Sequence, residues 1–283
     1  MILIADSGST KTSWRQIETE GIMGQADTIG FNPYYQNTDQ IAQTLRENLL
    51  PQLNGFRPHE IYFYGAGCSA KEKKDIVAQA LSQLFPGSDI HVHHDLEAAA
   101  HALCGHEAGI ACILGTGSNS CLYDGEKIVE NLPNLGFILG DEGSGGYMGK
   151  RIVQAYLNLE LPQDLHQAFV DRYQTDRDEI IDNVYSKPYP NRYMAGFAKF
   201  LYDNRTHPFI YQMIYRCLAD FFEKNIIRYP DYQNKETHFV GSIAFHFSDI
   251  LRTVARQYNV RLGTILENPI AGLSQYHQQK ITA

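Results

Sequence analysis

One structural pattern occurs twice in this chain, about a hundred residues apart. A buried strand, a short polar turn and a second strand are indicated at residues 2–17 and again at residues 109–123. The turns read DSGSTKT at residues 6–12 and GTGSN at residues 115–119. Glycine and hydroxyl residues in such turns leave clustered backbone N–H groups, which bind anions such as phosphate. The repeat predicts a duplicated α/β module in which the two loops hold a nucleotide.

Composition limits the classes of protein to which this chain can belong. Its 283 residues are enough for two domains, and 43% hydrophobic with 20% charged residues is typical of a packed globular protein. The net charge of −8 argues against a nucleic-acid partner, which needs a basic surface. The five cysteines form no C-x-x-C pair, so neither a zinc site nor a disulfide framework is indicated. With no signal-peptide pattern and no apolar run of membrane-spanning length, we expect a cytoplasmic protein without a membrane partner.

Strand and helix patterns alternate in the first part of the chain. Gly21 and Gly24 are expected to mark a turn after the first hairpin. A helix is expected over residues 38–53, capped by Thr38 or Asp39. The other expected elements are strands at residues 60–64 and 90–93 and helices at residues 71–85 and 96–104.

The second part is expected to be mainly helical between residues 143 and 230. A strand at residues 238–240 then leads into a helix at residues 243–258, and a last helix at residues 269–281 is expected to return to the first domain. The predicted N-terminal domain spans residues 1–108 together with 269–283, and the predicted C-terminal domain spans residues 109–268.

The first loop begins with a carboxylate. Asp6 ends the first strand, where it can hold a metal ion directly or through water. Neither loop has the order of a Walker A loop or of a Rossmann dinucleotide loop. Each loop taken singly could be an ordinary polar hairpin turn. Two such loops, each opening one half of the chain, favour phosphate binding.

Asp95 stands where a strand ends and a helix begins. Its carboxylate could cap the helix at residues 96–104, or it could accept a proton from an attacking hydroxyl group. The two roles are compatible, because a helix N-terminus also favours the ionised carboxylate. For His91, His93 and His94, structural roles are favoured over a metal site, since no carboxylates accompany them in a recognisable ligand spacing.

A second glycine-rich segment spans residues 136–146 and contains five glycines. Regular structure tolerates this poorly, so a close backbone approach is expected there. Asp141 and Glu142 could compensate a helix dipole, or one of them could bind substrate hydroxyls. Gly241 and Ser242 follow a strand and, taken alone, could be an ordinary turn into a helix.

Together these motifs resemble the N-acetylglucosamine kinase group. That group lies in the BadF/BadG/BcrA/BcrD branch of the sugar-kinase, actin and heat-shock ATPase superfamily. The resemblance implies two ribonuclease-H-like α/β domains with a nucleotide cleft between them. It also implies ATP and Mg²⁺ as cofactors, a small-molecule amino sugar as substrate, and a homodimer. From residue 2 to about residue 247, the matching segments are DSGSTKT, Asn32-Pro33, Gly65-Ala66-Gly67, Asp95, GTGSN, GDEGS and VGSIA.

The resemblance further implies roles for individual residues. Asp95 would be the base toward the 6-hydroxyl of the sugar, and Asp6 would position Mg²⁺. The residues implied for the sugar are Asn32, Ser118, Asn119 and Asp141, with Gly145 leaving room beside them. The residues implied for the cofactor are Asp6, Gly8, Ser9, Thr10 and Lys11 in the first loop, Gly115, Thr116 and Gly117 in the second, and Gly241 and Ser242 against adenosine.

One position departs from the family pattern. Members such as the mammalian kinase carry a tryptophan six residues before the aspartate of GDEGS, where this chain has Leu135. A wall of the sugar pocket is therefore changed, and glucosamine or a related hexose derivative is an alternative acceptor.

Our prediction is ATP-dependent phosphorylation of an amino sugar, with N-acetylglucosamine at its 6-hydroxyl as the expected reaction. Two other functions stay open. One is an ATPase that activates a 2-hydroxyacyl-CoA dehydratase, which would need cysteine thiolates for an iron–sulfur cluster. The other is a nucleotide-dependent sugar sensor that binds without phosphoryl transfer.

Overall fold

Two compact units make up the chain, and each contains one five-stranded sheet. The computed structural model describes residues 1–8, 11–18 and 21–282. Unit 1 comprises residues 1–107, 125–127 and 268–283, and unit 2 comprises residues 108–124 and 128–267.

The sheet of unit 1 is built around β1 (Ile2–Ser7), which is buried along almost its whole length. A strand covered on both faces is apolar throughout, which explains the run at residues 2–5. The other strands are β2 (Lys11–Glu18), β3 (Gly21–Ile29), β4 (Glu60–Gly65) and β5 (Asp89–His94). Their order is β3-β2-β1-β4-β5, with β2 and β3 antiparallel and β4 and β5 parallel to β1.

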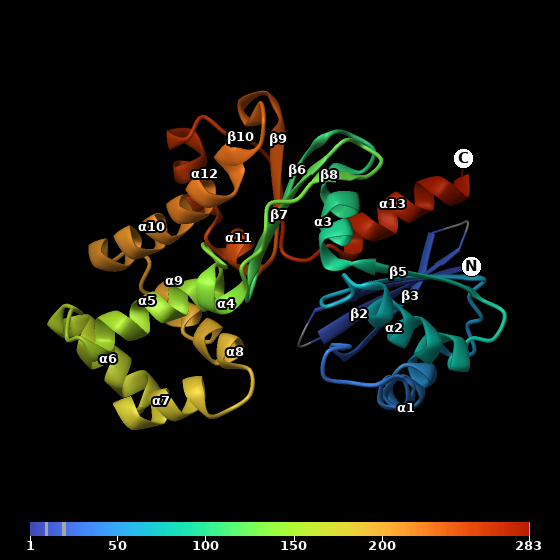
Figure 1. Cartoon of the computed structure of the whole chain (residues 1–283), viewed down its shortest axis with the longest axis horizontal. Coiled ribbons are helices and arrows are strands. Elements are labelled where there is room, and N and C mark those ends of the chain that lie inside the picture. The colour runs from blue at the N-terminus through green and yellow to red at the C-terminus, as the bar shows by residue number, and fades with distance from the viewer. Residues whose placement is uncertain (9–10, 19–20, 283) are drawn as a thin grey trace. The chain divides into compact units, whose positions relative to one another are not determined.

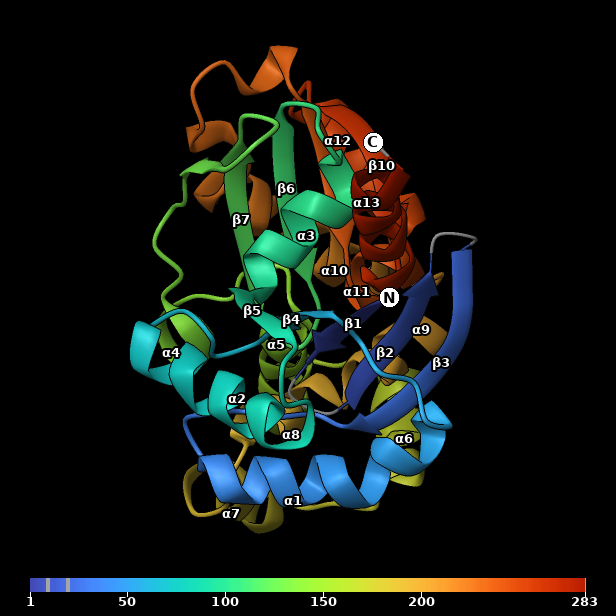
Figure 2. The same ribbon diagram turned by 90° about the vertical axis from the view of Figure 1, so that its right-hand side faces the viewer.

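Helices cover both faces of this sheet (Figures 1 and 2). On the face that carries Trp14 and Phe63 lie α1 (Thr38–Asn48) and α2 (Lys71–Leu84). On the face that carries Ile2 and Ile4 lie α3 (Asp95–Cys104) and α13 (Ile270–Thr282). The predicted C-terminal helix is thus present, and it packs on the N-terminal strands.

Three details of unit 1 differ from the sequence-based expectations. Gly24, expected in a turn, lies inside β3 beside a register shift, where an added Cβ would come within 3.0 Å of the Gln16 side chain. The helix expected over residues 38–53 ends at Asn48, and a short 3₁₀ helix (Leu50–Leu53) follows, because Pro51 cannot donate a helical hydrogen bond. Its cap is Asn37 rather than Thr38 or Asp39.

The sheet of unit 2 repeats the topology of the first. Its central strand β6 (Gly109–Leu114) pairs antiparallel with β7 (Ser118–Tyr123), which pairs antiparallel with β8 (Ile128–Glu130). On its other side lie the parallel strands β9 (Glu236–Val240) and β10 (Arg261–Leu266). The order β10-β9-β6-β7-β8 therefore matches that of unit 1, and the predicted duplication of an α/β module is confirmed.

Helices fill most of the remainder of unit 2. One face of the sheet packs Ile110, Cys112 and Leu114 into a core with the helices. These helices are α4 (Gly136–Leu139), α5 (Gly145–Leu157), α6 (Gln163–Tyr173), α7 (Arg177–Tyr185), α8 (Pro190–Ala195), α9 (Ala198–Asp203), α10 (Pro208–Lys224), α11 (Ser242–His246) and α12 (Ser248–Gln257). Short 3₁₀ helices span Ile226–Arg228 and Tyr232–Asn234.

Several elements of unit 2 differ from expectation. The helix expected over residues 243–258 is divided into α11 and α12 at Phe247, whose side chain is buried in the core. Strand β10 was not expected from the sequence. Its pairing with β9 shifts register beside Gly263, where the His238 ring occupies the space of a side chain and accepts the N–H of Thr264.

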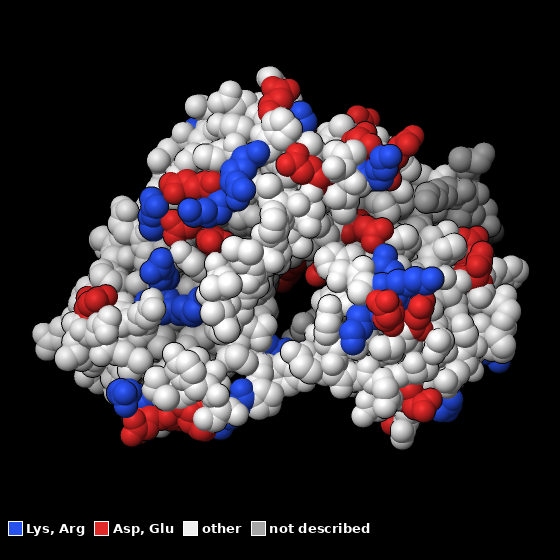
Figure 3. Space-filling model, in the orientation of Figure 1, with Lys and Arg blue, Asp and Glu red and all other residues white. Residues whose placement is uncertain are grey.

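The surface in Figure 3 carries acidic and basic side chains interspersed rather than segregated by sign. None of the helices in the described ranges is long and apolar enough to cross a membrane.

A prediction concerns the contact between α3 and α13. A Cβ at Gly272 would lie 2.4 Å from the carbonyl oxygen of Ala102, so the two helices would have to separate. We expect Gly272→Ala to lower the free energy of unfolding of unit 1 by about 1–3 kcal/mol. Thermal unfolding followed by circular dichroism measures this, with Gln275→Ala on the exposed side of α13 as the matched control. An unchanged melting curve for Gly272→Ala would contradict the close helix contact.

Candidate active site

The first group of candidate residues lies where three parallel strands of unit 1 end. The register places Ser7 of β1 beside Gly65 of β4, and Gly65 beside His94 of β5. Asp6 and Asp95 are therefore at the same edge of the sheet, the edge at which α/β proteins bind ligands. Asp95 is the first residue of α3, and His94 is its cap, so the alternative role of Asp95 as the cap residue is wrong.

Both carboxyl groups at this edge have a pKa above the usual value for aspartate. Burial, and next the charge of Asp95, raises the pKa of Asp6 to about 7. Burial also raises the pKa of Asp95. Among the described residues, no lysine or arginine forms an ion pair with either carboxylate. A divalent cation would neutralise the negative charge of the two carboxylates when they are ionised. Asp6 therefore fits the predicted Mg²⁺ site by its chemistry.

Asn32 lies beside the glycine loop that follows β4. Its Oδ1 accepts the N–H of Tyr34 at 3.0 Å, and a Cβ at Gly67 would come within 3.0 Å of the same oxygen. Gly67 has a φ of +80°, which also favours glycine. In the described part of the chain the side-chain NH₂ of Asn32 donates to no acceptor, so it is available to a ligand hydroxyl.

The first loop is described only in part. Gly8 donates its N–H to the carbonyl of Lys11 at 3.0 Å, and the Lys11 ammonium pairs with Asp27 at 3.0 Å. That ion pair is exposed and lies on β2 and β3. Ser9 and Thr10, both predicted to face phosphates, lie outside the described residues.

The second loop is fixed by the N-terminus of α5. The carbonyls of Gly115 and Thr116 accept the N–H groups of Gly145 and Gly146 at 2.8 and 3.0 Å. A Cβ at Gly146 would lie 2.9 Å from the Thr116 oxygen, which explains part of the glycine-rich segment. Within the described ranges, the N–H groups of Thr116 and Gly117 meet no protein acceptor. Two successive unpaired N–H groups fit a phosphate oxygen.

Asp141 joins the glycine-rich segment to the second loop. Its backbone has a φ of +57°, and its Oδ1 accepts the N–H of Ser118 at 3.1 Å. Burial raises the pKa of Asp141, although the Ser118 N–H and the charge of Lys150 oppose that shift. The expected helix start is not at Asp141 or Glu142, because Ser144 caps α5.

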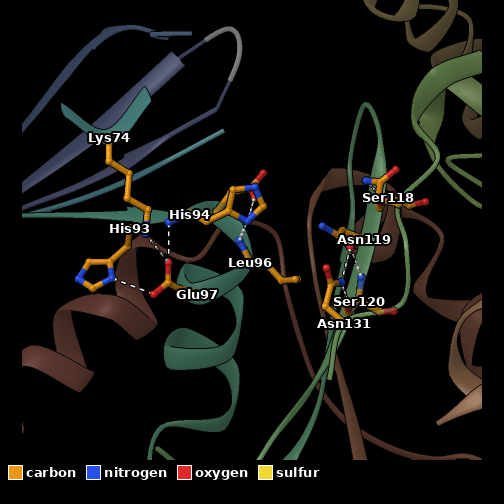
Figure 4. A network of polar contacts seen from close by, with 11 residues as sticks. Lys74, His93, His94, Leu96, Glu97, Ser118, Asn119, Ser120 and Asn131 are labelled. Atoms are coloured by element: carbon orange, nitrogen blue, oxygen red, sulfur yellow. Dashed lines mark hydrogen bonds and ion pairs between the residues drawn. The ribbon is translucent and has the colours of Figure 1, made fainter. Parts of the chain in front are cut away.

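Amide side chains extend this polar cluster along β7 (Figure 4). Asn119 Oδ1 accepts from the Ser120 N–H at 2.9 Å and from Asn131 Nδ2 at 3.1 Å. Asn134 Nδ2 donates to the carbonyl of Ser118 at 2.8 Å. Sequence reasoning missed both Asn131 and Asn134, since a single asparagine in a loop carries no motif.

A small cavity of about 80 Å³ lies beside Ser118 and Asn134 of this cluster. Ser118, Leu135 and Asp141 all line it. Leu135 stands at the position of the family tryptophan. Its side chain is 59% exposed, so it covers little of the cavity. The lining also includes Pro133, Asn134, Glu142, Lys224, Asn225 and Arg228. Of these, Lys224, Asn225 and Arg228 were not expected from the sequence.

A larger cavity of about 420 Å³ lies on the other side of the second loop, within unit 2. Gly115, Thr116, Gly145 and Ser242 line it, and its size is typical of a pocket for a nucleoside-sized ligand. Gly241 has a φ of +123°, and a Cβ there would lie 2.2 Å from the Leu114 carbonyl. The other walls come from α8, α9 and α11 and were missed by sequence reasoning: Ala195, Gly196, Ala198, Lys199, Tyr202, Ile243, His246 and Phe247.

Known structures with the same fold include candidate sugar kinases. No family model matches the sequence. The chain is similar to a candidate N-acetylglucosamine kinase from Porphyromonas gingivalis, with 41% identity, 99% of each chain covered and a TM-score of 0.94. A candidate N-acetylglucosamine kinase from Chromobacterium violaceum shares 18% identity, with 97% of this chain and 98% of that chain covered and a TM-score of 0.77.

A third similar structure, of component A of (R)-2-hydroxyglutaryl-CoA dehydratase from Acidaminococcus fermentans, shares 15% identity. It covers 100% of this chain and 99% of that one, with a TM-score of 0.50. Both this match and the one from Chromobacterium violaceum show the fold alone.

Two α/β units of one topology, each with a strand–loop–strand at its start, define the class of proteins with the actin-like ATPase fold, to which sugar kinases belong. Within that class, the 41% identity over the full length to the Porphyromonas gingivalis protein shows the family. The chain belongs to the N-acetylglucosamine kinase-like family of ATP-dependent sugar kinases.

The raised pKa of Asp6 leads to a prediction for the metal-free protein. In the unfolded chain Asp6 ionises near pH 3.8, and in the native protein it ionises near pH 7. The native state therefore binds more protons between these values, so stability falls as the pH rises from about 4 to about 7. The Asp6→Asn variant has no carboxyl group to titrate at this position, so it does not lose stability in this way. We expect its melting temperature to exceed that of wild type by an amount that grows as the pH rises from about 4 to about 7.

Asp27→Asn is the matched control. Hydrogen bonds from Lys11 and Ser13 outweigh slight burial and lower the pKa of Asp27, so its replacement should give no gain at about pH 8. A gain for Asp6→Asn that does not depend on pH would contradict the raised pKa.

Proposed function

We propose that this protein transfers the terminal phosphoryl group of ATP to the 6-hydroxyl of an amino sugar, with N-acetylglucosamine as the first candidate. The observation that carries the proposal is the pair of carboxylates with raised pKa at the ends of β1 and β5. Phosphoryl transfer needs one group that holds a metal ion and another that takes a proton from the acceptor. The full-length similarity to a protein named for N-acetylglucosamine supports the choice of sugar.

Asp6 would hold Mg²⁺, with Gly8, Ser9, Thr10 and Lys11 forming the first phosphate loop. When bound, ATP supplies the phosphoryl group, and Mg²⁺ neutralises the charge of its phosphates. The unpaired N–H groups of Thr116 and Gly117, next to Gly115, would hold phosphate oxygens. Adenosine would occupy the cavity of about 420 Å³ beside Gly241 and Ser242.

The sugar would bind through Asn32, Ser118, Asn119 and Asp141, with Gly145 leaving space. The cavity shared by Ser118, Leu135 and Asp141 supports this assignment, because a carboxylate accepts hydrogen bonds from sugar hydroxyls. Leu135 offers less surface to an N-acetyl group than a tryptophan would. Glucosamine or a related hexose derivative is therefore the alternative acceptor.

Asp95 would take the proton of the attacking hydroxyl. Burial raises the pKa of Asp95 above the usual value for aspartate, which makes the carboxylate a stronger base. By family resemblance we also propose the BadF/BadG/BcrA/BcrD branch and a homodimer. The cytoplasmic location is proposed from the sequence pattern alone.

The dehydratase-activator alternative draws support only from a fold similarity. All five cysteines are buried, and burial raises the pKa of Cys68 and Cys217 to about 12. Such thiols are poor ligands for an iron–sulfur cluster shared with a second subunit.

Replacing the proposed base gives a direct test. We expect Asp95→Asn to lower kcat by about 10²–10⁴-fold, while ATP binding measured by calorimetry stays nearly unchanged. Asp89→Asn is the matched control, since Asp89 begins β5, the strand that ends just before Asp95, and its side chain is 81% exposed. Near-normal turnover of Asp95→Asn would remove Asp95 from the mechanism.

A panel of sugars in a coupled ADP-release assay tests the acceptor. We expect the highest kcat/KM for N-acetylglucosamine, followed by glucosamine. We expect little ADP release without sugar, because the catalytic site assembles around ATP only when the sugar binds, and closure then excludes water. Tight sugar binding without ADP release would favour the sensor. A brown, iron-containing preparation would favour the activator.

A further inference from the structure

The short helix α4 is attached to the start of β7 at both of its ends. Before α4, the Asn134 side chain donates to the carbonyl of Ser118 at 2.8 Å and accepts the first N–H of α4 at 2.7 Å. After α4, Asp141 Oδ1 accepts the N–H of Ser118 at 3.1 Å. The segment 134–141 thus binds both backbone polar groups of Ser118. Asn134, Leu135 and Asp141 of this segment line the cavity of about 80 Å³ that we assign to the sugar.

The helix itself adds little to the stability of this wall. It is a single turn, Gly136–Leu139, which is too short to be stable alone. Ile138 and Leu139 are 83% and 74% exposed, so they contribute little packing. Phe137 packs against the core of unit 2, and a Cβ at Gly146 would lie 3.4 Å from its ring. Phe137 is therefore the residue through which α4 meets the start of α5 (Figure 1).

Lys150 of α5 holds α4 at this residue. Its ammonium group donates a hydrogen bond to the carbonyl of Phe137. The ammonium nitrogen also lies 4.8 Å from the centre of the Phe137 ring and 5.5 Å from that of the Tyr147 ring, which are cation–π distances. A hydrogen bond from a charged donor stabilises more than a neutral one. Lys150 therefore fixes the middle of the segment whose ends are bound to Ser118.

The charge of Lys150 also acts on Asp141. Burial raises the pKa of Asp141, whereas a backbone hydrogen bond and the charge of Lys150 lower it. Burial lowers the pKa of Lys150, and the charge of Asp141 opposes that shift. Each group thus favours the ionised form of the other. The other charged groups near Asp141 are Glu142, which raises its pKa, and Lys224 and Arg228, which line the same cavity.

We propose that Lys150 is a positioning residue for the acceptor sugar, an inference that rests on the proposed function. It holds α4 through the Phe137 carbonyl, so that Leu135 and Asp141 keep their places in the wall of the cavity. Its charge keeps Asp141 ionised, as a carboxylate that accepts hydrogen bonds from sugar hydroxyls. Lys150 is not among the residues that line the cavity, so it acts on sugar binding through its neighbours.

Lys150→Met tests this role, because methionine keeps an aliphatic stem but has neither the charge nor the donor. We expect KM for the sugar to rise about 10-fold, with kcat changed less than about threefold and KM for ATP unchanged. Lys150→Arg keeps a charge and donors, so it should restore part of the sugar affinity. Arg151→Met is the matched control, since Arg151 is the next residue of α5 and bonds the hydroxyl of Tyr147 instead. It should keep the sugar KM of wild type.

Carbon-13 NMR of the Asp141 carboxyl group tests the charge without any sugar. The signal is identified by its absence from Asp141→Asn. Without Lys150 the pKa of Asp141 is higher, so the titration should move to higher pH in Lys150→Met and stay in place in Arg151→Met. The ratio of sugar KM between Lys150→Met and wild type should therefore grow as the pH falls through the pKa of Asp141. Lys150→Gln is also neutral, and it gives the same test if methionine destabilises the fold.

Hydrogen exchange tests the attachment of α4 directly. The backbone N–H groups of residues 136–141 should exchange faster in Lys150→Met than in wild type, because the contact at Phe137 is lost. The exchange of α1 in unit 1 is the internal reference and should not change.

The two proposals fail in different ways. A wild-type protein that phosphorylates no amino sugar would remove the proposed function. An active wild type, together with a Lys150→Met variant whose sugar KM, Asp141 titration and hydrogen exchange are all unchanged, would overturn only the role of Lys150.

Discussion

Each unit depends on one central strand that pairs antiparallel with the next strand and parallel with a later one. β1 pairs with β2 and β4, and β6 pairs with β7 and β9. The antiparallel partner produces a tight loop at the carboxyl end of the central strand. The parallel partner ends at the same edge and adds a helix start or a turn there. In unit 1 this pairing places Asp6 and Asp95 at one edge of the sheet, next to the first loop. In unit 2 it places the second loop and Gly241 at the corresponding edge.

Glycine determines how closely the second loop approaches its supports. Gly145 and Gly146 at the start of α5 donate to the loop carbonyls, and the unpaired N–H groups of the loop are left for a ligand. Gly149 continues the contact, since a Cβ there would lie 1.8 Å from the Met194 carbonyl of α8. This approach of α5 and α8 brings Ala195 to the wall of the larger cavity. The packing of α5 against α8, and not the second loop itself, thus determines this wall of the larger cavity.

Elements with a strong local signal were predictable. Strand β1 and strand β6 are apolar because both of their faces are covered, and α2 and α13 carry helical spacing. Strands β3 and β10 were missed, because each lies at an edge, is half-exposed and contains a glycine beside a register shift. Asp6 and Asp95 could be predicted as candidates, because Asp6 lies near the end of one strand and Asp95 directly follows another. Tyr202 and His246 could not, because their place in the cavity depends on how α9 and α11 pack.

The sequence alone determined the duplicated topology, the two loops, the acidic residues at strand ends and the family resemblance. These are local in the chain, since apolar runs, glycine spacing and hydroxyl residues carry them. Only the tertiary structure decided that His94, rather than Asp95, caps α3 and that the ring then lies against the carboxylate. The raised pKa of Asp6 likewise could not be predicted from the sequence. It is caused by burial and by the charge of Asp95, which follows a strand two places away in the sheet. Both depend on distances between groups that the fold, and not the order of residues, brings together.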